Sequence, residues 1–291
     1  MPSWFAKNSL MKMAIRARGH ISCHEKPKLN DNKKYINELV NYGLLNRIED
    51  KFVISHPLIH TFVRKNYKPS NITLERIAAY YINYINSIPK VSKNFSLIDQ
   101  ERTHIMQVMT QCKNHMFFQS ANSLVFAVHE YLDICGYWTD LVSTLECGVK
   151  VSQELKSYKD KCIHLSNLGL VFRDLGYIDK SIAYFDQALS ISKDIGDRKL
   201  ENLNLGNLGN VNRLLGNVSK AIDYIEQAMT ISKHFDKKNY SRHLNQMGLA
   251  LSDSGRNKKA IEYYQQALAL DRKNGYRKGE AGRGNTFMQH R

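Results

Sequence analysis

A ten-residue motif that occurs three times limits what this chain can fold into more than any other feature. It reads NLGLVFRDLG at residues 167–176, NLGNVNRLLG at 207–216 and QMGLALSDSG at 246–255, so successive copies begin 40 and 39 residues apart. A second motif follows each copy, as KSIAYFDQAL from Lys180, KAIDYIEQAM from Lys220 and KAIEYYQQAL from Lys259. Repetition at this period is typical of helical pairs that stack into an array. The sequence therefore predicts an all-α fold built as a solenoid of helical hairpins.

Glycine marks two positions in every unit. The first helix of each pair is predicted to end at Gly176, Gly216 or Gly255, because glycine is a common helix stop. Three further glycines lie inside the first helices, where each costs about 1 kcal/mol relative to alanine. They are Gly169, Gly209 and Gly248. We expect them to allow close approach of the second helix, with Ala188, Ala228 and Ala267 as its small partners.

This pattern resembles the tetratricopeptide repeat. A spacing of 39–40 residues in place of about 34 is similar to the lengthened repeats of kinesin light chains and of bacterial STAND regulators. We place the repeats at residues 121–275, with a degenerate first copy around Gly136. The resemblance implies a binding protein in which the first helices line a concave groove that receives a peptide.

Nine residues are candidates for lining that groove, because they recur on the first helices at matched register. They are Asn167, Leu170, Arg173, Asn207, Asn210, Arg213, Asn245, Gln246 and Leu249. Side-chain amides can pair with a peptide backbone, and the arginines can bind carboxylates through two parallel hydrogen bonds, which makes an acidic ligand one option. We expect Asn207 and Arg213 to be exposed without a ligand. The alternative is that these polar residues form only the hydrated face of amphipathic helices.

Residues 31–68 have a different pattern, which predicts a small winged-helix-like unit. A helical pattern ends at Gly43, and two apolar segments at 44–48 and 52–54 then flank a polar turn at 49–51. Pro57 is placed to open a second helix in its first turn. The predicted order is therefore helix, β-hairpin, helix.

The segment NELVNYGLLNRIEDKFVISHPLIHTFVRKN, which begins at Asn37, resembles the winged-helix domain of STAND ATPases of the NB-ARC type. In that family a histidine at the start of the last helix contacts nucleotide, and His56 holds the matching place. Pro57 departs from the family, where aspartate is common. The chain also lacks the GxxxxGK[ST] phosphate loop, so the resemblance implies the C-terminal part of a STAND regulator without its ATPase.

Charge is concentrated at the two ends of the chain. The formal net charge is +15, and residues 1–30 hold six Lys or Arg against one acid. We describe residues 1–30 as a basic N-terminal segment, 69–120 as a helical connector and 276–291 as a truncated repeat or flexible basic tail. Basic segments of this kind are either hydrated tails or sites that attract nucleic acid or an anionic membrane surface. A nucleic-acid-binding regulator that uses the winged-helix unit is therefore the alternative function.

No motif indicates an enzyme, so we expect no catalytic residue, cofactor or metal. His20, Cys23 and His24 could share zinc with Cys112 and His115, but about 90 residues separate the halves and structural zinc modules are more compact. The five cysteines are odd in number and scattered, which favours reduced thiols and a cytoplasmic location. No apolar run approaches the ~20 residues of a membrane span. The predicted function is a scaffold or sensor in signal transduction that binds a protein or peptide.

Overall fold

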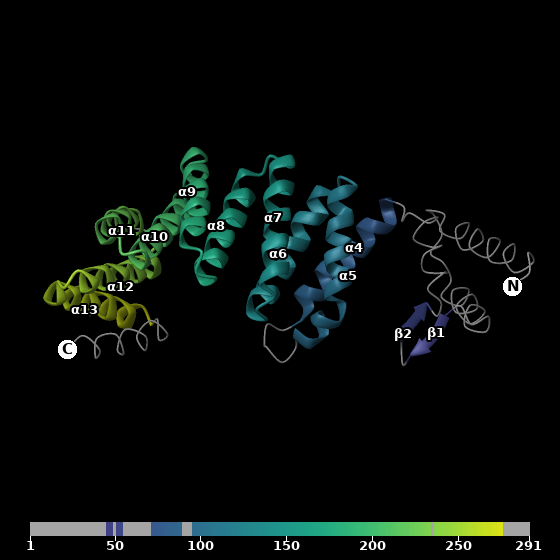
Figure 1. Cartoon of the computed structure of the whole chain (residues 1–291), viewed down its shortest axis with the longest axis horizontal. Helices are drawn as coiled ribbons and strands as arrows, with labels where there is room; N and C mark the ends of the chain where they lie inside the picture. Colours follow the sequence, from purple (N-terminus) through teal and green to yellow (C-terminus); the bar gives the residue numbers. More distant parts are fainter. Residues whose placement is uncertain (1–44, 49–50, 55–70, 89–94, 234–235, 276–291) are drawn as a thin grey trace, which may run out of the picture. The chain divides into compact units, whose positions relative to one another are not determined.

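The computed structural model describes residues 45–48, 51–54, 71–88, 95–233 and 236–275 (Figure 1). The chain divides into two compact units, Met1–Ser70 and Asn71–Arg291, which we consider separately. Several predicted features lie outside the described residues. These are the basic segment 1–30, the two helices of the winged-helix-like unit, His56, and the tail 276–291.

The first unit contains the predicted β-hairpin. Strand β1 (Leu45–Ile48) pairs in antiparallel fashion with β2 (Lys51–Ile54), and the register joins Leu45 to Ile54 and Ile48 to Lys51. The prediction of two short strands around a polar turn is therefore confirmed. The winged-helix assignment of residues 31–68 stays a prediction, because the residues predicted to form its helices are not among those described.

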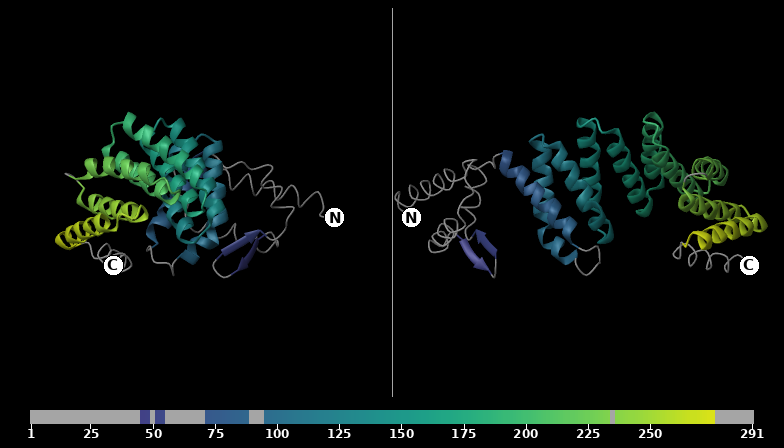
Figure 2. Two further views of the ribbon diagram at one scale, coloured as in Figure 1. Left: turned by 60° about the vertical axis from the view of Figure 1, so that its left-hand side comes forward. Right: turned by 180° about the vertical axis from the view of Figure 1, so that it is seen from behind.

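The described part of the second unit consists of α-helices connected by short turns (Figure 2). Their bounds are α4 Asn71–Ser87, α5 Phe95–Asn114, α6 Phe118–Ile134, α7 Trp138–Glu154, α8 Tyr158–Asp174, α9 Ile178–Asp194, α10 Arg198–Leu214, α11 Val218–Ser232, α12 Lys237–Asp253 and α13 Asn257–Asn274. Each of α6 to α12 packs against the helix that follows it. The first helices of successive pairs also contact one another, α8 with α10 and α10 with α12. The predicted solenoid of helical hairpins is confirmed.

The turns between helices explain the glycines at the ends of the first helices. Gly176 has φ +80°, a left-handed conformation that residues with a Cβ rarely adopt. Its N–H donates to the carbonyl of Arg173 at 3.0 Å, and the N–H of Tyr177 donates to Phe172 at 2.8 Å. These two bonds satisfy carbonyls that the helix end leaves unpaired. Gly216 and Gly255 end α10 and α12 in the same way.

The interior glycines make room for a large side chain of the paired helix. A Cβ added to Gly169 would lie 2.6 Å from the ring of Phe185, and one added to Gly209 would lie 2.6 Å from Ile225. At Gly248 the ring of Tyr264 would be 2.4 Å away. Close approach was predicted correctly, but its partner was not. The predicted partners Ala188, Ala228 and Ala267 are fully buried in the core, yet the residues that fill the space over the glycines are the larger ones at 185, 225 and 264.

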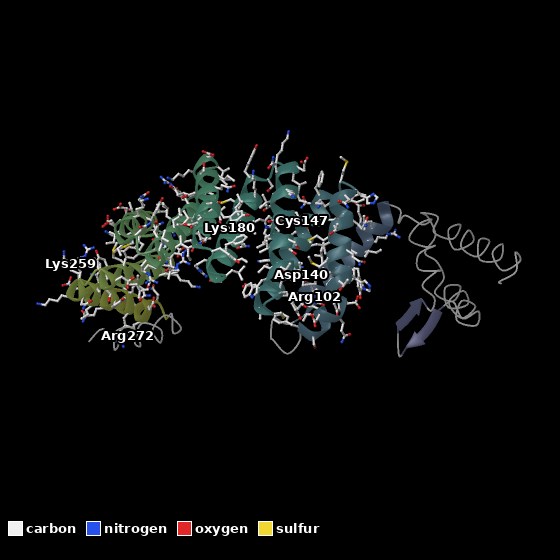
Figure 3. The ribbon with its side chains drawn as sticks, viewed as in Figure 1. Arg102, Asp140, Cys147, Lys180, Lys259 and Arg272 are labelled. Atoms are coloured by element: carbon white, nitrogen blue, oxygen red, sulfur yellow. The ribbon has the colours of Figure 1, made fainter. Side chains whose placement is uncertain are left out.

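The helices before the repeats share a hydrophobic core with them. One cluster of buried side chains runs from Leu74 on α4 to Val171 on α8. Polar contacts fasten the same junction, because Nη1 of Arg102 donates to Asp140 at 3.0 Å and its guanidinium lies 3.7 Å over the ring of Tyr137. Figure 3 shows Arg102 on α5 beside Asp140 on α7. The connector is therefore a packed part of the array. None of the helices described here is long and apolar enough to cross a membrane.

Candidate functional site

The first helices α8, α10 and α12 carry all nine candidate residues. Most of them are half-buried, which is the exposure expected on the concave side of a helical array. These half-buried residues are Asn167, Leu170, Arg173, Asn210, Arg213, Asn245, Gln246 and Leu249. Below, the surface formed by the nine candidates is called the first-helix face.

Asn207 differs from the prediction, since only 7% of it is exposed. Its Nδ2 is buried and has no hydrogen-bond partner among the described residues. Oδ1 of Asn245 is also buried and has no hydrogen-bond partner among the described residues. The expectation that Asn207 is exposed is therefore wrong, and it is also wrong for Arg213, whose side chain is 20% exposed and whose Nε is buried. The reason is that α10 lies between α8 and α12, so the central first helix has neighbours on both sides.

The two arginines of the first-helix face already have acidic partners. Arg173 contacts Asp174 on its own helix, with Nη2 2.7 Å and Nε 2.8 Å from Oδ1. Nη1 of Arg213 on α10 donates to Oδ2 of Asp253 on α12 at 2.8 Å. This second pair joins successive repeats. A ligand carboxylate at either arginine would have to compete with these aspartates.

Gln246 mainly connects two first helices. Its Nε2 donates to the backbone carbonyl of Gly206 on α10 at 3.2 Å, and its Oε1 lies 2.8 Å from Nδ1 of His243. A Cβ on Gly206 would lie 2.4 Å from the His243 ring, so the absence of a side chain there lets the ring pack against α10. Gln246 thus helps to set the spacing of α10 and α12.

A set of buried polar contacts between first helices was not predicted. His164 on α8 places Nε2 2.9 Å from Oδ1 of Asn122 on α6. At the next interface Ser166 donates to Oδ1 of Asn204 at 2.7 Å. His243 on α12 places Nε2 2.9 Å from Oδ1 of Asn202. A polar contact therefore occurs at each of three successive first-helix interfaces. The sequence signal was the recurrence of Asn or His about 40 residues apart, one to two turns before the repeated glycines.

Burial keeps these histidines neutral near pH 7. It lowers the pKa of His164 to about 4, and a smaller effect of Asp160 opposes this shift. Burial likewise lowers the pKa of His243 to about 4, against a hydrogen bond with Gln246. Neutral imidazole can serve as a hydrogen-bonding spacer in a core without the cost of a buried charge. The contacts are therefore structural.

Arg242 is a second residue that sequence reasoning missed. It lies on α12, three residues before Asn245 and seven before Leu249, so the three share one side of the helix. Its Nε and Nη2 atoms are buried without a hydrogen-bond partner in the part of the chain that the structure describes. Because the matching positions in the two preceding repeats are Leu203 and Ile163, no repeated signal pointed to an arginine.

The structure gives no support to a zinc site. Cys112 is buried, and burial raises the pKa of its thiol to about 11, whereas His115 is exposed. His20, Cys23 and His24 lie outside the described residues. Among the residues that are described, no group of three or more His, Cys, Asp or Glu could hold a metal ion.

The tetratricopeptide repeat model matches this sequence twice, at residues 160–234 and 199–273. The matches coincide with the helical pairs α8 to α13, so this part of the chain is an array of tetratricopeptide repeats. A search of curated proteins found no match.

Solved structures of similar fold come from several proteins. Aspartyl phosphate phosphatase F of Bacillus subtilis is 15% identical, with 84% of this chain and 62% of that chain covered and a TM-score of 0.54. PlcR of Bacillus thuringiensis, solved with the peptide PapR7 and DNA, is 12% identical, with 89% and 85% covered and a TM-score of 0.51. A putative kinesin light chain of Podospora anserina is 13% identical, with 74% and 97% covered and a TM-score of 0.49. At these identities the likeness concerns the fold.

Proposed function

We propose that the protein is a non-enzymatic regulator or scaffold that binds a peptide segment of a protein partner on its first-helix face. One observation carries the proposal: buried polar atoms on this face have no partner among the described residues. They are Nε of Arg213 and, as a pair of one donor and one acceptor, Nδ2 of Asn207 and Oδ1 of Asn245. Buried polar groups in folded proteins are almost always hydrogen-bonded, so such atoms are costly unless a ligand uses them.

A peptide backbone is the ligand that fits this pair. An extended strand of peptide offers N–H and C=O groups in alternation, and an asparagine side chain can accept from one or donate to the other. Leu170 on α8 and Leu249 on α12 are half-buried and add apolar surface to the first-helix face. The fold of PlcR, which was solved with a peptide, supports a peptide ligand rather than a small molecule. A scaffold or sensor in cytoplasmic signal transduction is the role that we propose.

The test starts from a random peptide library displayed on phage and selected on the full-length protein. Enriched peptides are synthesised, and their dissociation constants are measured by fluorescence anisotropy. Asn207→Ala combined with Arg213→Ala should weaken binding at least about tenfold, because truncations at the centre of an interface are the costly ones. The control, Lys233→Ala with Lys237→Ala, removes two exposed positive charges and should change binding less than about twofold.

Three results would contradict the proposal. The first is failure to enrich any peptide. The second is equal weakening by the control pair together with a steep loss of binding between 50 and 200 mM salt. Such a loss is typical of phosphate-dominated contacts and would favour the nucleic-acid function instead. The third is peptide binding that neither variant affects, which would place the site elsewhere on the protein.

We also propose that the hairpin β1–β2 belongs to a winged-helix unit of residues 31–68, of the kind that STAND regulators carry. The register from Leu45–Ile54 to Ile48–Lys51 supports a wing of this size. Amide exchange on the full chain tests the proposal. Protection of residues 33–43 and 57–66 comparable to that of the strands is expected, and fast exchange in both segments would contradict it.

A further inference from the structure

Exposed cations recur at matched register along one edge of the array. Because each helix packs against the next and a short turn joins them, the turns between helical pairs lie on one edge and the turns within pairs on the other (Figure 1). We call the first of these the between-pair edge. It carries two sets of exposed cations: Lys159, Lys199 and Lys238, each the second residue of a first helix, and Lys193, Lys233 and Arg272 at the ends of the second helices. Within each set the residues are 40 and 39 apart.

The two edges of the array differ in charge. The between-pair edge consists of the described residues within 151–161, 191–201, 229–240 and 271–275, which expose ten Lys or Arg side chains and two acids. The opposite edge consists of residues 131–141, 171–181, 211–221 and 250–260, which expose five Lys or Arg side chains and four acids. Lys259 and Arg272, towards opposite ends of α13, mark the two edges in Figure 3. Only the between-pair edge is therefore strongly basic.

Partly buried acids on the between-pair edge do not neutralise it, because they are engaged in the fold. Asp197 caps α10 by accepting from the backbone N–H of Lys199 at 3.1 Å, and it pairs with Nζ of Lys159 at 3.0 Å. Asp236 caps α12 by accepting from the backbone N–H of Asn239 at 3.0 Å. Four of the repeated lysines form no ion pair with another described residue: Lys193, Lys199, Lys233 and Lys238.

The lysines at the starts of the first helices oppose the stability of the fold. The free N–H groups of a helix N-terminus carry a partial positive charge, which favours an acid and disfavours a lysine there. Asp179, the second residue of α9, follows this rule. Lys159, Lys199 and Lys238 break it at the same position of three successive first helices. A local rule that is broken repeatedly at one register indicates a use other than folding.

The regular spacing of these cations suits a ligand whose negative charges are also regularly spaced. Successive first helices are in contact, and helices in contact lie about 8–10 Å apart. This step is about one Debye length at 0.1 M salt, so the fields of successive lysines reinforce one another. A nucleic-acid strand carries one phosphate per ~3.4 Å of its axis, which gives about three phosphates per step. An acidic protein segment has no fixed charge period.

Apolar exposure on the two edges argues against a membrane as the ligand. Proteins that bind at a membrane surface insert large apolar side chains beside their basic residues. Here most of those side chains lie on the opposite edge: Ile134, Trp138, Leu175, Tyr177, Leu214 and Leu215. The between-pair edge exposes only Tyr158 and Ile195 among the large apolar residues described. Tyr158 is 57% exposed beside Lys159, where its ring can stack on a base.

We propose that the between-pair edge binds the phosphate backbone of a nucleic acid. This is a second function, and it does not depend on the peptide site of the first-helix face. The repeated lysines contact phosphates along one strand, so binding is governed by charge and does not select a base sequence. Single-stranded RNA, single-stranded DNA and duplex DNA can all supply such a backbone.

The test measures dissociation constants of the full-length protein by fluorescence anisotropy between 50 and 200 mM salt. The three probes are a labelled single-stranded RNA, a single-stranded DNA of the same sequence and the corresponding duplex DNA. The test variant is Lys199→Gln with Lys238→Gln. Its matched control, Lys220→Gln with Lys259→Gln, removes two exposed lysines from the first turns of α11 and α13 on the opposite edge. Both variants lower the net charge equally.

We expect the test variant to weaken binding at least about tenfold at 100 mM salt, and the control less than about twofold. The slope of log K against log salt should become shallower by about 1.5–2 in the test variant alone, because two phosphate contacts are lost. Circular dichroism and urea unfolding should show the test variant folded at least as well as the wild type, since the removed charges opposed the helix dipole. The probe that binds most tightly identifies the source of the phosphates.

Four results would overturn the proposal. The first is no binding of any probe below about 10 μM at 50 mM salt. The second is equal weakening by the test variant and the control, and the third is binding that neither affects. The fourth uses vesicles that contain phosphatidylserine, and poly-glutamate. If either binds more tightly than all three nucleic acids and loses this binding in the test variant, the edge serves a membrane or an acidic protein instead.

Discussion

Nε2 of His243 lies 2.9 Å from Oδ1 of Asn202, and the same distance separates His164 from Asn122 two interfaces away. Each contact joins the first helix of one repeat to the first helix of the previous one. Exposed fractions of 1% or less place both rings in the interior. The array is thus held in register partly by neutral polar contacts, which tolerate burial only while the rings stay uncharged.

The first prediction follows from His164. Its pKa is 6.5 in an unfolded chain and about 4 in the fold, because burial outweighs the attraction of Asp160 and adds to the effect of His129. The unfolded state therefore binds the proton first as the pH falls. The contribution of His164 to the free energy of unfolding is therefore fully present above pH 6.5. It should decrease by about 3 kcal/mol as the pH falls from about 6.5 to 4. Urea unfolding at several pH values measures it.

His164→Asn is the matched variant, because Asn204 holds this position in the next repeat. The variant should have a lower free energy of unfolding than the wild type at neutral pH. Its free energy of unfolding should also decrease less than that of the wild type as the pH falls to 4. An identical pH profile for the variant and the wild type would mean that His164 is not the titrating group.

The second prediction concerns the space above Gly209. Gly209→Ala adds a Cβ that would lie 2.6 Å from Cγ1 of Ile225 and 3.3 Å from the carbonyl oxygen of Ala221. Overpacking of this kind costs about 1–3 kcal/mol, which should exceed the helix-propensity gain of about 1 kcal/mol. Gly209→Leu should cost more. Urea unfolding gives the free-energy change.

A double variant tests the cause. Ile225→Ala removes the obstructing atoms, so Gly209→Ala should destabilise less in that background than in the wild type. Additive effects of the two changes would show that another contact is responsible.

The third prediction concerns the end of α7. Lys156 has φ +53°, whereas the corresponding turn after α9 has Gly196 at φ +66°. Because a left-handed conformation is strained for a residue with a Cβ, Lys156→Gly should stabilise the protein by about 0.5–1 kcal/mol. Gly196→Lys should have the opposite effect. A loss of stability in Lys156→Gly would indicate that the lysine side chain makes a stabilising contact.

The paired helices could be predicted from the repeated sequence alone. A period of 40 residues accommodates two helices per unit, and the order of the two repeated motifs gives the order of the helices. The glycines at 176, 216 and 255 located the turns, since few other residues adopt a positive φ there. Strands β1 and β2 were predicted from two short apolar segments around a polar turn. In each case a local pattern determines a local structure.

The candidate site was harder to predict, because the first helices carry polar residues on two sides. One side includes Asn210, Asn245 and Gln246 on the first-helix face. The other includes Asn202, Asn204 and His164, which are buried between neighbouring helices. A helical pattern of polar residues does not indicate which side faces a neighbour. Only the packing of α10 between α8 and α12 separates them, and it also buries Asn207.

The last prediction concerns the buried guanidinium of Arg242. Arg242→Met keeps most of the length of the side chain and its apolar contacts while it removes the buried, unpartnered Nε and Nη2. Leaving such groups without partners costs about 1–3 kcal/mol, and replacing a buried charge by an apolar residue is often stabilising. The variant should therefore unfold about 2–4 °C higher than the wild type, in a thermal scan followed by circular dichroism. Arg198→Met serves as the control, because the Arg198 side chain is 70% exposed and is paired with Glu201, so its loss should change stability by less than about 0.5 kcal/mol. A lower melting temperature for Arg242→Met would mean that the guanidinium has a stabilising partner in the folded protein.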